Sequence, residues 1–202
     1  MLWNASALKG YALEATDGLL GNVSDFFFND TSWMARWLVV ETGSWLMHRK
    51  VLLPPSTLGK PGQNHMPVTL TMEKIKTSPS IATDEPVSRQ MESSIFDYYD
   101  LQPYWSTYYP AGGDLISPPY VPDFYIVGSR RRDSDISDGA PDPGDPHLRS
   151  IHSLSSYSIH ADDGEIGRVE DFLIDDADWG INYIKANTGN WWSSHEVLLT
   201  PR

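Results

Sequence analysis

The sequence predicts a mainly β protein, made of two small β-barrel domains and a connecting segment with one or two short helices. The first reason is a pattern, A-x-D-G-x-x-G-x-V-x-D-F, that occurs at Ala15–Phe26 and again at Ala161–Phe172. The second is a set of short runs of aromatic and β-branched residues. Turn residues separate these runs, as is typical of small barrels and sandwiches.

The repeat extends well beyond the shared pattern. When the chain is shifted so that Asp17 falls on Asp163, identical residues continue to coincide without a gap. The matches are Tyr11 with Tyr157, Asp30 with Asp176, Trp33 with Trp179, Thr42-Gly43 with Thr188-Gly189, Trp45 with Trp191, and Val51–Leu53 with Val197–Leu199. Such a long ungapped match indicates two copies of one domain. We call them copy one and copy two.

Four positions of the pattern are predicted to be structural in each copy. They are Asp17, Gly18, Gly21 and Asp25 in copy one, and Asp163, Gly164, Gly167 and Asp171 in copy two. Asp-Gly favours a tight primed hairpin turn, which needs positive φ angles. The second glycine is typical of a bulge or of a close backbone approach. Valine at Gly18 or Gly164 is therefore expected to cost about 1–3 kcal/mol.

The strands of copy one are expected in order along the chain. The predicted ranges are Tyr11–Thr16, Gly21–Phe28, Trp33–Val40, Lys50–Leu53 and, as a closing strand, Met66–Thr71. Trp33–Val40 is apolar on both faces, so alternation does not identify its core side. Copy two has Lys185 where copy one has Val39, which predicts that this side reaches solvent near the strand end.

The middle of the chain is predicted to contain two helices. Thr71 can cap a helix over Met72–Thr77, and Ser88 a helix that ends near Tyr99. Val121–Val127 has the composition of a further strand, and the Gly, Pro, Asp and Ser that follow indicate a linker. The predicted organisation is a first domain at 1–80, an aromatic-rich connecting segment at 81–127, a flexible linker at 128–147 and a second domain at 148–202.

These residues resemble the PRC-barrel family, which includes the cytoplasmic domain of the photosynthetic reaction centre H subunit. The likeness rests on Gly10-Tyr11, the repeated pattern, Arg36–Gly43 and Lys50–Pro55. Segments farther along also look like bacterial tandem PRC-barrel proteins: Pro86–Gln90, Tyr104-Trp105 and Asp145–Ser150. The resemblance implies the barrel fold and a role in assembling an electron-transfer complex or in docking during ribosome maturation. It implies no catalytic residues.

Composition excludes several classes of function. The formal net charge is −12, which disfavours nucleic acid because its binding depends on Lys and Arg at phosphates. The chain contains no cysteine, so disulfides and thiolate metal sites are impossible. The start has no signal-peptide pattern, and no apolar run approaches the roughly 20 residues of a membrane span. We therefore expect a cytoplasmic protein without membrane insertion.

Candidate chemistry is sparse. Asp163, Asp171 and Asp176 are candidate ligands for Ca²⁺, within an acidic cluster that also contains Asp162, Asp175 and Asp178. The competing interpretation is that aspartates at turns and strand edges bond to the backbone. His147, His152 and His160 lack the spacing of a metal site, and no nucleophile elbow, P-loop or dinucleotide motif occurs.

We therefore expect a non-enzymatic interaction module without a cofactor. The alternative is a calcium-binding or hydrolytic protein that uses the copy-two aspartates. Copy two ends soon after Val197–Leu199 and has no counterpart of Met66–Thr71, which leaves a sheet edge to be paired. Val121–Val127 is a donor within the chain. A second protomer is the preferred donor, which predicts a homodimer.

Overall fold

The structure is a computed structural model, and it describes residues 1–79, 87, 89–101, 146–155, 157–161, 164–188 and 195–201. Several sequence predictions lie outside these residues. They are the strand Val121–Val127, nearly all of the predicted linker, the cap Ser88, the candidate ligand Asp163, and the aromatic residues Tyr104, Trp105 and Trp191. The domain boundaries also stay predictions.

Copy one begins with two elements that the sequence did not predict, β1 (Leu2–Asn4) and α1 (Ala5–Leu8). The strands that follow are β2 (Ala12–Ala15), β3 (Gly18–Asn29), β4 (Met34–Thr42), β5 (Lys50–Leu53) and β6 (His65–Pro67). Two short 3₁₀ helices, η1 (Ser44–Leu46) and η2 (Pro55–Thr57), flank β5. The helices α2 (Met72–Lys76) and α3 (Arg89–Tyr98) come next and agree with the two predicted helices.

Copy two repeats this order. Its elements are β7 (Leu148–Ser150), α4 (Ile151–Leu154), β8 (Ser158–Ala161), β9 (Gly164–Asp175), β10 (Ile181–Asn187) and β11 (Glu196–Leu199). In the register of the repeat, β7 and α4 are equivalent to β1 and α1, and β8 to β11 are equivalent to β2 to β5.

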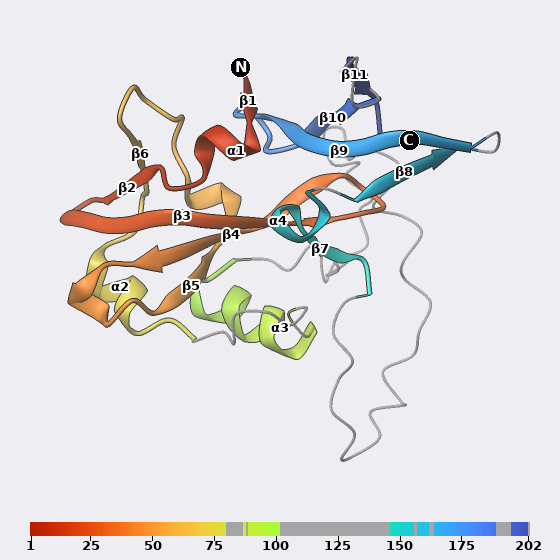
Figure 1. Cartoon of the computed structure of the whole chain (residues 1–202). Helices are drawn as coiled ribbons and strands as arrows, with labels where there is room; N and C mark the ends of the chain where they lie inside the picture. The colour runs from red at the N-terminus through yellow and green to blue at the C-terminus, as the bar shows by residue number, and fades with distance from the viewer. Residues whose placement is uncertain are drawn as a thin grey trace, which may run out of the picture.

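Each long strand pairs on one side with the strand that follows it and on the other side with two short strands. The first sheet has the order β5-β4-β3-β2-β6, with β7 also paired to β3 (Figure 1). The second has the order β1-β9-β10-β11, with β8 also paired to β9. Both β2 and β8 are antiparallel to their long strands, whereas β6 runs parallel to β2.

The two copies exchange their first strands. The N-terminal strand β1 pairs with β9 of copy two, with Trp3 opposite Ile174. Reciprocally, β7 of copy two pairs with β3 of copy one, with Arg149 opposite Phe28. Figure 1 shows β1 and α1 beside β9, and β7 and α4 beside β3. Since both exchanges use the same register, the copies are related by an approximate twofold rotation.

The contact at the centre of this rotation is also symmetrical. Trp33 and Trp179 are equivalent, and both have positive φ, at 57° and 61°. The amide of Ala35 donates to the Trp179 carbonyl at 2.9 Å, and the amide of Ile181 donates to the Trp33 carbonyl at 2.8 Å. Phe26 of copy one stacks on Trp179, with the ring centroids 6.0 Å apart. Buried residues of both copies therefore form one continuous hydrophobic core.

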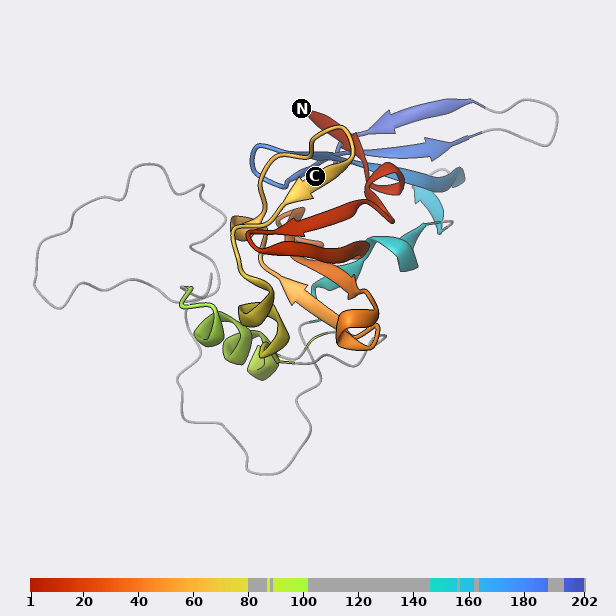
Figure 2. The ribbon, with the colours of Figure 1, turned by 90° about the vertical axis from the view of Figure 1, so that its left-hand side faces the viewer.

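Helix α3 covers the first sheet through a buried polar contact. Glu92 is 0% exposed and accepts a hydrogen bond of 2.7 Å from the indole nitrogen of Trp37 on β4. Phe96, one turn farther along α3, packs on the Trp37 ring with the centroids 5.0 Å apart. Figure 2 shows α2 and α3 side by side beneath this sheet, where the Tyr98 hydroxyl binds the Lys74 carbonyl.

The fold confirms a mainly β protein with few helices, but its details differ from the expectations in three places. No pairing closes either sheet into a barrel among the described residues. The predicted closing strand Met66–Thr71 is the shorter β6, followed by a single bridge from Val68 to Leu58. The proline at position 67 ends the regular pairing because it has no amide hydrogen to donate.

The hairpin turn of copy one also differs from the prediction. Ala15 pairs with Gly18, so the loop consists of Thr16 and Asp17, and neither has a positive φ. The predicted primed turn is therefore wrong for copy one. Asp17 has another role, because its carboxylate accepts a hydrogen bond of 2.7 Å from the Met72 amide at the start of α2.

Candidate functional site

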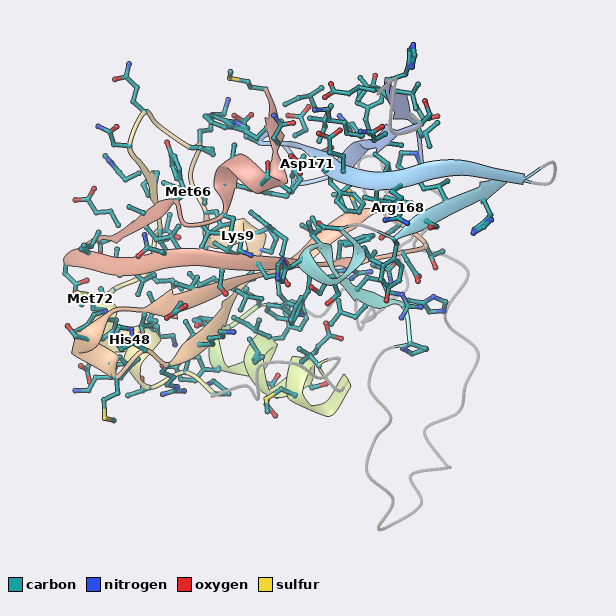
Figure 3. The ribbon with its side chains drawn as sticks, in the orientation of Figure 1. Lys9, His48, Met66, Met72, Arg168 and Asp171 are labelled. Atoms are coloured by element: carbon teal, nitrogen blue, oxygen red, sulfur yellow. The ribbon has the colours of Figure 1, made fainter. Side chains whose placement is uncertain are left out.

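Asp25 and Asp171, the last aspartates of the repeated pattern, hold the beginnings of the exchanged helices. Asp171 lies on β9 and accepts hydrogen bonds from the amide of Ser6, at 3.1 Å, and from the Ser6 hydroxyl (Figure 3). Asp25 lies on β3 and accepts from the His152 amide at 3.1 Å and from the Ser150 hydroxyl. Each carboxylate also accepts from the amide of the next residue in its own strand.

These contacts satisfy amide groups that a short helix cannot satisfy by itself. The first N–H groups of a helix have no partner within it, and a side chain usually caps them. The N-cap of α1 is Asn4, whose side chain makes no capping hydrogen bond. Asp171 supplies that acceptor from the other copy. The sequence predicted a structural role for this aspartate, and its partners lie at the opposite end of the chain.

A second pair of equivalent aspartates, Asp30 and Asp176, holds the exchanged strands. Asp30 binds Nδ1 of His147 and Nε of Arg149, both at 2.9 Å. Asp176 accepts from the α-amino group of Met1 at 2.7 Å and from the indole nitrogen of Trp3 at 3.0 Å. In both copies the aspartate's own amide donates to the carbonyl of the residue before the exchanged strand.

The contact at Met1 alters the acidity of its partners. Hydrogen bonds from the α-amino group, and then from Trp3, lower the pKa of Asp176 below its usual value. The same amino group and the Ala177 amide lower the pKa of Asp175. Conversely, Asp176 and Asp175 raise the pKa of the amino group. All three effects favour the charged forms that make the contact.

Two of the three proposed calcium ligands, Asp171 and Asp176, have other roles in the described structure. Asp171 and Asp176 both bind donors of the N-terminal segment, and Asp163 lies outside the described residues. In the part of the chain that the structure describes, no three His, Asp or Glu side chains group closely enough to hold a metal ion. Asp171 and Asp176 thus fix the N-terminal segment on copy two.

Gly21 and Gly167 lie where two strands approach too closely for any side chain. A Cβ on Gly21 would lie 2.2 Å from the carbonyl oxygen of Glu41, and one on Gly167 would lie 2.1 Å from that of Asn187. The hairpin register shifts beside each glycine, and their φ angles are 153° and 156°. Gly18 is less confined, since the nearest atom to its Cβ would be the flexible Met72 sulfur at 2.9 Å.

The hairpins β2–β3 and β8–β9 differ at their outer edges. The outer edge of the second hairpin is the candidate interaction site. The outer edge of β2 is covered by β6, and the Val68 amide donates to the Glu14 carbonyl at 2.8 Å. The equivalent edge belongs to β8, where His160 corresponds to Glu14. Within the described ranges, β8 pairs with β9 alone. We call this the β8 edge.

Several of these residues were missed in the sequence. Ser6, Ser150 and Trp3 bind aspartates that occur in both copies of the repeat. These three residues themselves are replaced by other residues in the opposite copy. The available signal was weak: Leu2 coincides with Leu148 in the repeat register, and Asn4 with Ser150. Asn and Ser are both frequent helix N-caps, which would have indicated a helix start at each place.

Comparison with protein-family models and with curated proteins finds no match to this chain. None of the helices in the described residues is both long enough and apolar enough to cross a membrane.

Proposed function

We propose that this chain is a non-enzymatic interaction module of PRC-barrel type, which docks a strand of a protein partner along the β8 edge. The observation that carries the proposal is the contrast between β2, whose outer edge pairs with β6, and β8, whose outer edge has no partner among the described residues. Unpaired N–H and C=O groups of an edge strand recruit another strand.

The tandem-barrel part of the proposal rests on the repeat. Both copies have a long central strand, the same neighbours on its two sides and a register shift at the same glycine. In copy one, η2 and β6 lead from β5 back to β2, which is the course that a small barrel would take. A strand added to the β8 edge would cover copy two at the place where β6 covers copy one.

The preferred partner is a second copy of this chain, which makes the protein a homodimer. A symmetrical pair of β8 edges would satisfy each other by antiparallel pairing, as isologous interfaces do. The alternative donor is Val121–Val127 of the same chain. By resemblance, the assembled module would serve in building an electron-transfer complex in the cytoplasm.

The edge can be tested with a proline at His160. In copy one, the Glu14 carbonyl points away from β3 and accepts a hydrogen bond from the Val68 amide. Since His160 is equivalent to Glu14, its N–H and C=O are expected to point away from β9. His160→Pro removes one outward N–H and leaves the β9 side intact, because proline is tolerated on edge strands. We expect dimer affinity to fall by about tenfold or more, because each missing edge contact weakens strand addition. The readout is light scattering across a concentration series.

His160→Ala is the matched control, because it removes the same imidazole and keeps the amide hydrogen. It should associate like the parent. A parent chain that is monomeric at tens of micromolar would contradict the homodimer. Equal association of the proline and alanine variants would contradict docking at the β8 edge.

A further inference from the structure

A cavity of about 750 Å³ lies between the first sheet and the segment that copy two contributes to it. Its walls come from β3, β4 and β5 on one side and from β7 and α4 on the other. Helix α4 lies against β3 in Figure 1, and Lys9 follows the end of α1 (Figure 3). Cavities of this size are common among small-molecule sites. The exchange of segments between the copies therefore creates a space large enough for a ligand.

The lining combines apolar surface with positive charge. Phe27, Val39 and Leu154 provide apolar walls, and Lys9, Lys50 and Arg149 provide cationic groups. Among the described residues of the lining, Asp25 is the only carboxylate, and both of its oxygens accept hydrogen bonds from the start of α4. A net positive lining is notable in a chain whose formal net charge is −12.

The three cationic groups differ in whether they have hydrogen-bond or ion-pair partners. Arg149 donates from Nε to Asp30, and Lys9 donates to Nδ1 of His152 at 3.1 Å. For Lys50, no carboxylate of the described residues lies within ion-pair distance of Nζ. Glu41, directly opposite it in the strand register, is 3.7 Å from His48 instead. Lys50 is thus a half-buried cation without a counter-ion in the described residues.

Copy two provides an internal comparison. The positions equivalent to Ser24, Val39 and Lys50 are Glu170, Lys185 and Glu196. There Lys185 binds both carboxylates, with its Nζ 3.6 Å from Glu170 and 3.0 Å from Glu196. The hydrogen bond that the Lys185 ammonium donates to Glu196 raises the pKa of Lys185. The same three positions therefore form a satisfied ion cluster in copy two and an apolar, cationic wall in copy one.

We propose that the cavity of copy one binds a small organic anion with an apolar body, such as a medium-chain carboxylate. The apolar body would contact Val39, Phe27 and Leu154, where burial of hydrocarbon supplies the driving force. The anionic group would provide the counter-ion that Lys50 lacks. This proposal does not depend on strand docking at the β8 edge.

Calorimetric titration of the full chain tests the ligand class, with octanoate as the probe. We expect octanoate to bind, and octanol and acetate to bind at least about tenfold more weakly, because octanol lacks the charge and acetate lacks the apolar body. Lys50→Met should weaken octanoate binding by about tenfold and leave octanol unchanged. Lys60→Met, which alters a lysine outside this cavity, should bind octanoate like the parent.

A second variant transfers the copy-two cluster into copy one. Ser24→Glu, Val39→Lys and Lys50→Glu together should abolish octanoate binding, because an internal ion cluster would occupy the cavity wall. Circular dichroism and melting temperature establish whether this triple variant folds. If the triple variant does not fold, the single variant Lys50→Met still tests the proposal. Absence of octanoate binding, or equal binding by the parent and Lys50→Met, would overturn the proposal.

Discussion

Alanine at Gly21 or at Gly167 is expected to lower the free energy of unfolding by at least about 3 kcal/mol, combining overpacking with backbone strain. The added Cβ would lie 2.2 Å from the Glu41 carbonyl oxygen in copy one and 2.1 Å from the Asn187 carbonyl oxygen in copy two. Both obstacles are backbone atoms of the neighbouring strand, which cannot turn away as a flexible side chain can. The strands would have to separate.

Urea denaturation, followed by tryptophan fluorescence, measures the effect on each variant. Gly43→Ala is the matched control, because its φ is −67° and its nearest new contact, with Trp45, is an ordinary 3.6 Å. We expect that control to stay within about 0.5 kcal/mol of the parent. A Gly21→Ala protein as stable as Gly43→Ala would show that the strands do not approach as closely as described.

The sequence predicted the strands of copy one well because their signals are local. Lys50–Leu53 has the same bounds in the structure, and α2 begins after Thr71, whose hydroxyl accepts from the Lys74 amide at 3.2 Å. Alternation and turn residues report on the conformation of a segment. They do not report which sheet the segment joins, so the exchange of β1 and β7 could not be predicted from them.

The aspartates that hold the exchanged segments were predictable only in part, because the sequence pattern gives local information. The repeat indicated Asp25 and Asp171 as structural, but their partners Ser6 and Ser150 are identified only by the three-dimensional exchange. The substitution of Lys185 for Val39 was interpreted as solvent exposure. In the structure Val39 is 2% exposed and lines the cavity. Val39 is buried because the segment of copy two packs beside it. The alternation of residues within one strand does not contain that information.

Removing the carboxylate at Asp171 is expected to cost about 2–3 kcal/mol, since hydrogen bonds to charged groups and helix caps contribute on this scale. Asp171 is 8% exposed and accepts from the Ser6 amide, the Ser6 hydroxyl and the Phe172 amide. Asp171→Ala leaves these donors without their partner. Asp171→Asn should cost less, because its amide oxygen can still accept. Denaturant unfolding compares the two variants with the parent.

The location of the damage separates reciprocal capping from general destabilisation. Asp171→Ala should speed amide exchange in Leu2–Leu8 more than in β7, whereas Asp25→Ala should do the reverse, speeding exchange in β7 and α4. Asp178→Ala is the control, because among the described residues this aspartate accepts only from the Gly180 amide within its own turn, at 2.9 Å. Two aspartate variants with identical exchange patterns would contradict the reciprocal arrangement. Opposite patterns would demonstrate that each copy's aspartate holds the segment donated by the other.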